Sequence, residues 1–263
     1  MTKIKVDTHT HSIFSGHALG TLWENAKCAS MAGMEAICMT DHFGAYSYID
    51  KRHNLNFGAS LNFAAIQQSI EGVRILTGSE MDIVDLDGHL AGFDTPYEFQ
   101  QSYNTAEYML EHLEVVIASL HAFTGYRSGS KLDYTRMYCN VAATSGVCII
   151  GHMDRAGLPF EIDPVLITAK EHGTLIEINE HSVAYACNFA DNTNEMTRKI
   201  AARCAELEVE VAVGSDAHCP QNVGRFDSAL KLLEEIAFPE ELIANTTFEK
   251  FYKRISLKAK AAR

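Results

Sequence analysis

"KVDTHTHSIFSGH" (residues 5–17) places three histidines, His9, His11 and His17, within nine positions. An H-x-H pair alone is a weak signal, because 12 histidines in 263 residues produce such pairs by chance. The residues before the pair, however, have the pattern of a short buried β-strand, which places His9 and His11 at its carboxyl end. Whether these histidines form a functional site depends on the residues at the ends of the other predicted strands.

Seven short runs rich in Val, Ile, Leu and Met recur along the chain, each bounded by Gly, Asp, Ser or His. They lie at residues 3–11, 36–42, 73–80, 115–121, 146–152, 174–181 and 209–218. Helical periodicity separates most of them, at residues 21–34, 60–72, 106–114, 136–146, 163–173 and 194–208. Alternating strands and helices predict an α/β fold with a parallel sheet, and seven units predict a closed or nearly closed barrel of the TIM type.

The segments outside these units have their own patterns. "DLDGHL" (residues 85–90) contains an Asp-Gly pair and predicts a small hairpin. Residues 226–236 and 239–255 predict two closing helices. Apolar residues make up 47% of the chain and show no linker-like shift, so we expect residues 1–263 to form a single domain.

The composition limits partners and location. The formal net charge of −12 disfavours a nucleic-acid partner, because nucleic-acid-binding surfaces are usually basic. The seven cysteines include no C-x-x-C pair and suit reduced thiols. The sequence also shows no secretion leader and no run of 18 apolar residues. We therefore expect a cytoplasmic protein without a membrane partner, and no pattern indicates its oligomeric state.

Six of the seven predicted strands end in histidine, and the seventh ends in Glu80. In parallel α/β barrels these carboxyl ends surround one shared pocket. Together with one histidine from a following loop, the candidate metal ligands at this rim are His9, His11, His17, His42, Glu80, His121, His152, Asp216 and His218. Imidazole and carboxylate ligands suit zinc, manganese or iron. One zinc ion uses about four ligands, so nine candidates fit three ions.

These motifs resemble those of the polymerase and histidinol phosphatase (PHP) superfamily of metal-dependent phosphoesterases. The resemblance covers nearly the full length and is carried by "DTHTHS" (7–12), "SGH" (15–17), "TDH" (40–42), "GSE" (78–80), "SLH" (119–121), "GHMDR" (151–155), "EIN" (177–179) and "GSDAH" (214–218). Their order is most similar to that of small bacterial phosphatases with three zinc ions on a distorted (β/α)7 barrel. The resemblance therefore implies the PHP fold, with the metal site at the carboxyl rim.

The resemblance also implies how the ligands divide. One metal ion would lie on His9, His11, Glu80 and Asp216, a second on Glu80, His121 and His152, and a third on His17, His42 and His218. Three divalent ions, zinc in the first place with manganese or iron as alternatives, would make the pocket locally positive. The implied reaction is hydrolysis of a small phosphomonoester by a hydroxide bridging the ions, because coordination lowers the pKa of water to about 7.

Four further residues are candidates for roles beside the metals. His181 ends the sixth predicted strand but has no place in the family's ligand pattern, so we expect it on the substrate side, where it can bind phosphate or protonate the leaving group. Arg155 and Arg225 follow strand-end motifs and offer forked donors to a phosphate, although surface roles are the default for arginine. Asp7 shares a predicted face with His9 and can hold its imidazole. The predicted catalytic set is therefore His9, His11, Glu80, Asp216 and His181.

Three other functions explain part of the pattern. An amidohydrolase also begins with H-x-H but usually has a bridging lysine on a middle strand, and "VVIASLH" (115–121) contains none. A PHP-type nuclease would need a basic or aromatic surface for nucleic acid. A non-catalytic metal-binding protein would carry the same ligands. We favour the phosphatase, and we expect the loops at residues 43–59, 122–133 and 181–193 to select its small phosphorylated substrate.

Overall fold

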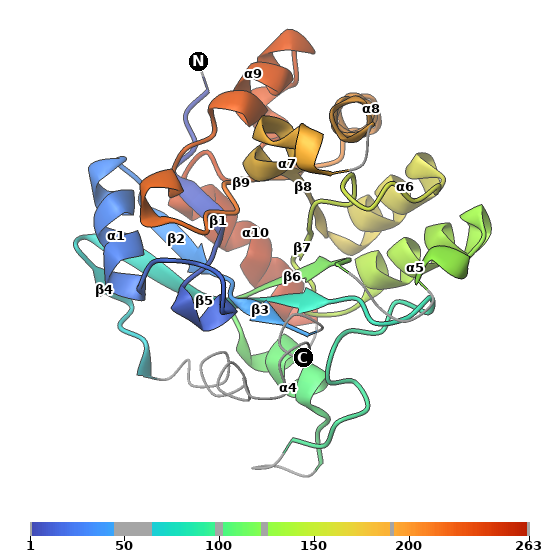
Figure 1. Cartoon of the computed structure of the whole chain (residues 1–263), viewed down its shortest axis with the longest axis horizontal. Helices are drawn as coiled ribbons and strands as arrows, with labels where there is room; N and C mark the ends of the chain where they lie inside the picture. The colour runs from blue at the N-terminus through green and yellow to red at the C-terminus, as the bar shows by residue number, and fades with distance from the viewer. Residues whose placement is uncertain (1, 45–64, 98–101, 122–125, 190–191, 262–263) are drawn as a thin grey trace.

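The computed structural model describes residues 2–44, 65–97, 102–121, 126–189 and 192–261. A central parallel sheet curls into a nearly closed barrel (Figure 1), in the order β1 (Val6–Thr10), β2 (Ala36–Met39), β5 (Val73–Asp82), β6 (Val115–Ser119), β7 (Ile149–Ile150), β8 (Leu175–Asn179) and β9 (Val211–Gly214). Two short strands, β3 (His42–Phe43) and β4 (Ser69–Ile70), pair with β5. The predicted (β/α)7 barrel is confirmed.

Helices surround the strands (Figure 1). They are α1 (Leu22–Met31), α4 (Thr105–His112), α5 (Lys131–Ala143), α6 (Ile162–His172), α7 (Glu180–Ala184), α8 (Thr193–Leu207), α9 (Asp227–Glu235) and α10 (Phe248–Ala261). Local sequence explains where several of them begin, because Thr21, Asn104 and Ser130 each form a capping box with an acidic residue three positions later. Among the described residues, no helix is both long and apolar enough to cross a bilayer.

Two predicted helices differ from the structure. Residues 60–64 of the predicted helix 60–72 lie outside the described residues, and its end forms β4, which pairs antiparallel with β5. The reason is a tight turn at Glu71 and Gly72, whose positive φ angles of 52° and 76° reverse the chain. The second closing helix begins at Phe248 rather than at residue 239, because Ile243 first pairs with β9.

The predicted hairpin at residues 85–90 is confirmed. Ile83 and Leu90 form an antiparallel bridge on either side of it. The Asp85 carboxylate accepts the backbone N–H groups of Asp87 and His89, each at 3.0 Å, and so fixes the turn.

The two ends of the barrel have different chemistry. Phe251 and Ile255 of α10 pack in one apolar cluster with Val6, Val115 and other residues near the starts of the strands. Figure 1 shows α10 lying behind the strands. The apolar plug therefore occupies the amino-terminal end of the barrel, which leaves the polar strand ends at the other rim.

Asn245 closes the seam between the first and last strands. Its fully buried side-chain amide donates to the carbonyl oxygens of Val6 and Val213, both at 2.8 Å. Its side-chain oxygen accepts the N–H group of Val213 at 3.0 Å. Nearer the rim, the two segments bond directly, because the Asp216 N–H group donates to the carbonyl oxygen of His9. This seam fixes the spacing between His9 and Asp216.

Replacing Asn245 with alanine is expected to lower the free energy of unfolding by about 3 kcal/mol, because buried backbone groups of both strands lose their partners. Urea unfolding followed by circular dichroism measures the change. Asn140→Ala is the matched control, since it removes one exposed hydrogen bond to Asp87 and is expected to cost less than about 1 kcal/mol. Equal losses in the two variants would contradict the role given to Asn245.

Candidate metal centre

Glu80 lies at the centre of the predicted ligands. We refer to these nine side chains as the rim cluster: His9, His11, His17, His42, Glu80, His121, His152, Asp216 and His218. Glu80 is fully buried. Its Oε2 lies 2.7 Å from His42 Nδ1 and 3.4 Å from His9 Nε2. Its Oε1 lies 2.8 Å from His152 Nε2 and 3.6 Å from His121 Nε2. Histidines from four parts of the barrel therefore meet at one carboxylate.

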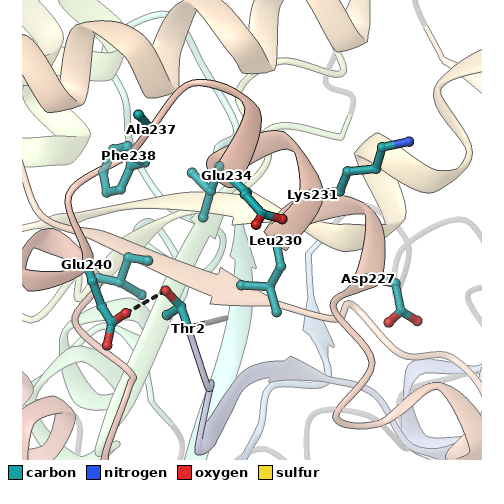
Figure 2. Close-up of a pocket in the computed structure, with 10 residues that line it drawn as sticks. Thr2, Asp227, Leu230, Lys231, Glu234, Ala237, Phe238 and Glu240 are labelled. Carbon is teal, nitrogen blue, oxygen red and sulfur yellow. Dashed lines mark hydrogen bonds between the residues drawn. The ribbon is translucent and has the colours of Figure 1, made fainter.

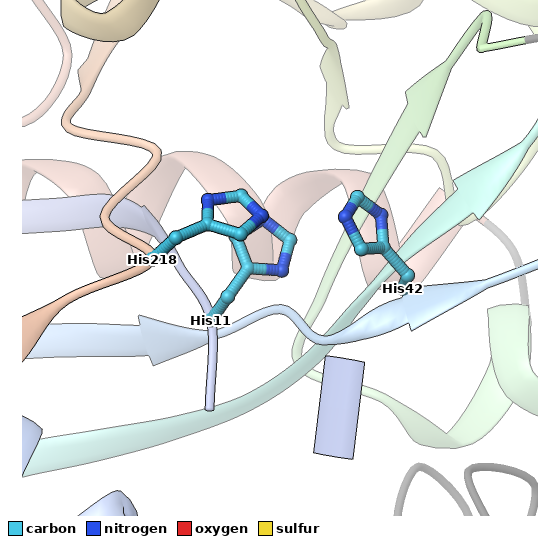
Figure 3. A group of neighbouring side chains, drawn as sticks. All are labelled: His11, His42 and His218. Carbon is cyan, nitrogen blue, oxygen red and sulfur yellow. The ribbon is translucent and has the colours of Figure 1, made fainter. Parts of the chain in front are cut away.

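The remaining members of the rim cluster lie beside this carboxylate. Asp216 Oδ1 is 3.2 Å from His11 Nε2. The ring centre of His11 lies 4.2 Å from that of His218 and 4.3 Å from that of His42 (Figure 3). The ring of His17 lies 4.5 Å from that of His218. The structure therefore brings all nine predicted ligands into one cluster.

Three sets of ligand atoms in the rim cluster are compact enough to hold an ion, with all atoms of a set within 4.8 Å of one another. The sets are His9, His11 and Glu80; His42, Glu80 and His121; and His11, His42 and His218. The last set contains His11 at the place where the family resemblance implies His17. The three sets overlap, because His11, His42 and Glu80 each belong to two of them.

Several polar atoms at the centre are buried without a hydrogen bond among the described residues. They include His9 Nε2, His11 Nε2 and Glu80 Oε2. Both nitrogens lie 3.4–3.5 Å from this oxygen. Unpartnered buried polar atoms are unfavourable, and native proteins satisfy nearly all of them. A divalent cation coordinated by all three atoms would remove this cost, so the residues fit a metal ion.

Two histidines of the rim cluster are held by carboxylates that are not themselves predicted ligands. His9 Nδ1 lies 2.7 Å from Glu177 Oε1, and His121 Nδ1 lies 2.6 Å from Asp82 Oδ1. Such partners fix the orientation of a ligating imidazole and raise its basicity. Neither Glu177 nor Asp82 was predicted to have a role. One signal in the sequence could have indicated them, because an acidic residue is unusual within a buried strand. Glu177 lies two positions before Asn179, and Asp82 lies two positions after Glu80, so each shares a strand face with that residue.

Glu177 connects two parts of the rim cluster. Besides His9, its carboxylate accepts the backbone N–H group of His152 at 2.9 Å. His152 has a φ of 21°, a value that non-glycine residues rarely adopt. A Cβ atom at Gly214 would lie 2.5 Å from Glu177 Oε1, so glycine at this position gives the carboxylate its space.

His11 is held through a short relay. Its Nδ1 lies 2.9 Å from Ser15 Oγ, and this hydroxyl donates to Asp41 Oδ1 at 2.6 Å. Asp41 also accepts the N–H and hydroxyl groups of Ser12, both at 2.7 Å. Through Ser12 and Ser15, Asp41 thus holds the loop that leads to His17.

Acidic neighbours raise the pKa of the two histidines that they hold. Burial lowers the pKa of His121, but Glu80 and Asp82 outweigh it and raise this pKa to about 9. Burial likewise opposes protonation of His9, and Glu177 and Glu80 outweigh it, so its pKa lies well above the usual value. Burial raises the pKa of Glu80, but the surrounding histidines hold it well below the usual range. Glu80 is therefore an anion, and protons and metal ions compete for both imidazoles.

Arg155 lies beside the rim cluster, with its donors directed at protein groups. Its Nη2 donates to Asp216 Oδ2 at 2.5 Å and to Asn179 Oδ1 at 2.6 Å, and its Nε donates to Ser182 Oγ at 2.7 Å. The guanidinium also lies over the Phe189 ring, 4.6 Å from its centre. Arg155 therefore orients a predicted metal ligand, a role that the sequence did not indicate.

The rim cluster opens into a cavity of about 460 Å³. Arg155 and His181 line this cavity, as do Tyr126, Arg127 and Phe189. The last three come from two loops predicted to select the substrate. Most of the third loop, residues 43–59, lies outside the described residues.

Two expectations about individual residues need correction or restriction. Strand β8 ends at Asn179, not at His181, because the Asn179 side chain accepts the N–H group of Ser182 and begins α7. His181 still faces the cavity, 6.2 Å from the His218 ring, and burial lowers its pKa. Arg225 lines a neighbouring cavity of about 160 Å³ instead.

The prediction that Asp7 holds the His9 imidazole is wrong. The Asp7 carboxylate accepts the backbone N–H groups of Ser215 at 3.0 Å and Gly224 at 2.8 Å. The register of β1 against β2 shifts between Asp7 and Thr10, so strict alternation does not hold there.

A larger cavity, of about 760 Å³, lies away from the histidines (Figure 2). Its walls come mainly from α9 and the following segment, and Thr2 donates a hydrogen bond to Glu240 across one side. None of the described residues that line it is a histidine. Volume alone therefore does not identify the site, and the chemistry of the rim cluster does.

The barrel and the rim cluster define a metal-binding α/β barrel protein, and comparison with known families agrees. The model of the PHP domain matches residues 7–237. The chain therefore belongs to the PHP domain family, and the resemblance seen in its motifs is confirmed.

Curated relatives extend the similarity over almost the whole chain. A probable phosphatase of Caldanaerobacter subterraneus subsp. tengcongensis is 39% identical over 258 residues, covering 98% of this chain and 93% of the relative. A probable phosphatase of Acetivibrio thermocellus is 37% identical over 261 residues, covering 99% of each.

A solved structure shares the fold. It is the histidinol phosphate phosphatase of Lactococcus lactis, complexed with zinc, L-histidinol and phosphate. The TM-score is 0.54 at 17% identity, covering 89% of this chain and 94% of the other.

Replacing Glu177 with glutamine is expected to weaken zinc binding about 10- to 100-fold, because His9 loses its charged partner. Competition with a chromogenic chelator measures the affinity. Glu114→Gln is the matched control, because its carboxylate contacts Arg74 and the Thr77 N–H group rather than the rim cluster. Unchanged zinc affinity in Glu177→Gln would show that this carboxylate does not support the site.

Proposed function

We propose that the protein is a metal-dependent phosphatase that hydrolyses a small phosphomonoester. The observation that carries the proposal is the convergence of buried histidine nitrogens, which form no hydrogen bond, on the Glu80 carboxylate at the open rim of the barrel. Membership of the PHP domain family and the similarity to probable phosphatases support the same reaction. The zinc and phosphate named for the Lactococcus lactis structure support the choice of metal and ligand.

In this proposal the rim cluster holds three divalent ions, zinc in the first place. Glu80 would bridge two of them, with His9, His11 and Asp216 on one side and His121 and His152 on the other. The third would lie on His17, His42 and His218. Divalent ions supply Lewis acidity toward phosphate oxygens and a hydroxide nucleophile at neutral pH.

The chain's own residues would orient the substrate. Arg155 holds Asp216 in place and borders the cavity, so it would also favour an anionic group there. His181 faces the same cavity, where it would bind phosphate or protonate the leaving group. Tyr126 and Phe189 form an apolar part of the cavity wall, and the leaving group would pack against their rings.

Purified protein is expected to release phosphate from members of a phosphomonoester panel, and a chelator is expected to abolish the release. His9→Ala and His218→Ala should each lower the rate at least about 100-fold, because the ions contribute several kcal/mol to the barrier. His112→Ala, on α4, is the control and should retain the rate. No metal-dependent release from any ester would refute the proposal, and shortening of single-stranded oligonucleotides instead would indicate a nuclease.

If His181 protonates the leaving group, its loss should matter only for poor leaving groups. His181→Gln is expected to lower kcat about 100-fold for an alkyl phosphate and to change it little for p-nitrophenyl phosphate, whose leaving group needs no proton. Steady-state kinetics with both esters measures the difference, with His172→Gln as the control. Equal losses for the two esters would exclude His181 as the general acid.

A further inference from the structure

A short helical turn places an arginine at the cavity beside the rim cluster. This turn, η3 (Tyr126–Ser128), lies between β6 and α5. Its middle residue, Arg127, lines the cavity of about 460 Å³ together with His121 and His218. Arg127 is exposed, so a ligand that enters the cavity has access to it. The proposed hydrolysis makes no use of this residue.

The segment that carries Arg127 is anchored to the core. Ser130 begins α5 through a capping box with Asp133. The Gly129 N–H group donates to the hydroxyl oxygen of the buried Tyr134 at 3.1 Å. A Cβ atom at Gly129 would lie only 3.0 Å from the Tyr134 ring, so glycine allows this close approach. The backbone at Arg127 is therefore held in place before a ligand binds, which lowers the entropic cost of binding.

Tyr126 holds one edge of the Arg127 guanidinium. Arg127 Nε donates to the Tyr126 hydroxyl at 2.7 Å, and Arg127 Cζ lies 4.9 Å from the centre of the Tyr126 ring. Within the described part of the chain, no other hydrogen bond or ion pair involves this side chain. The N–H donors of its two Nη groups are therefore available to a ligand. A guanidinium presents such donors as a planar fork that matches the two oxygens of a carboxylate.

The other charged side chains of the cavity do not compete for Arg127. Arg155 donates to Asp216 Oδ2 at 2.5 Å and to two further side chains. Asp216 is the only carboxylate among the described residues that line the cavity, and its charge is compensated by this ion pair. Arg127 is therefore the arginine of the cavity wall whose charge is left for a ligand.

We propose that Arg127 is a specificity-determining residue that binds a carboxylate on the leaving group of the phosphomonoester. The inference rests on the proposed phosphatase function, because the phosphate would lie at the rim cluster while the leaving group extends along the same cavity. One guanidinium balances the single charge of a carboxylate, whereas a second phosphate group carries more charge than Arg127 alone offsets. The substrate class is therefore small phosphorylated hydroxy acids.

Two esters of equal chain length test the proposal. 3-Phosphoglycerate ends in a carboxylate where glycerol 1-phosphate ends in a hydroxymethyl group. The parent protein is expected to have a kcat/KM about tenfold or more higher for 3-phosphoglycerate, because the carboxylate gains charge-assisted hydrogen bonds. Arg127→Gln should lose this preference and keep the kcat/KM for glycerol 1-phosphate within about twofold of the parent value.

The salt dependence separates an effect of charge from an effect of shape. Added sodium chloride is expected to reduce the preference of the parent protein and to leave the ratio in Arg127→Gln unchanged, because salt screens ion pairs at exposed side chains. Arg198→Gln, on α8, is the matched control. It removes an exposed arginine that donates to Glu235, away from the cavity, and should behave as the parent protein.

A kcat/KM for 3-phosphoglycerate equal to or below that for glycerol 1-phosphate in the parent protein would overturn the proposal. A preference that persists in Arg127→Gln would do the same, as would equal losses for both esters in this variant. In each of these results phosphate is still released, so the proposed phosphatase function stands. No metal-dependent release from any ester would instead refute the proposed function, and the inference with it.

Discussion

The Glu80 carboxylate is the group on which the polar rim depends. It has no contact with solvent, and histidines from β1, β3 and the segments after β6 and β7 lie around it. Burial of an isolated carboxylate costs several kcal/mol, so such a group persists only among cations or strong donors. Each surrounding histidine comes from a different part of the chain, and the barrel is what keeps them close enough to satisfy Glu80.

The architecture separates this polar centre from the apolar core. The starts of the strands and α10 form an apolar plug, in which Phe251 and Ile255 are buried. The ends of the same strands carry the ligands. Asn245 joins the first and last strands between these two regions, so the seam that completes the barrel also sets the position of His9 relative to Asp216. The starts of the strands therefore contribute to stability, and the ends of the same strands carry the predicted metal ligands.

The supporting groups determine how the ligands behave. Glu177 and Asp82 add negative charge near Glu80. Arg155 forms an ion pair with Asp216 and so compensates part of its negative charge. The carboxylates of the site therefore lie in its interior, whereas Arg127, Arg155 and His181 line the cavity at its mouth. Basic groups at the mouth suit a substrate that carries negative charge.

Much of the barrel and the rim could be predicted from the sequence, because apolar runs and their terminal histidines are local patterns. The contacts between strands could not. Glu177 reaches His9 across the barrel, and a shift in the register of β1 directs Asp7 elsewhere. The predicted helix at residues 60–72 was wrong at its described end because the Glu71–Gly72 turn outweighs helical periodicity there. These features depend on three-dimensional neighbours that spacing does not specify.

The central claim is that the strand ends form one polynuclear cation site. Anomalous diffraction from crystals of the zinc-loaded protein, recorded on both sides of the zinc absorption edge, tests it most directly. The account predicts separate anomalous peaks among the side chains of the rim cluster, with two of the peaks in contact with Glu80. Zinc peaks only at surface residues, with the rim histidines hydrogen-bonded to one another or to water, would contradict it.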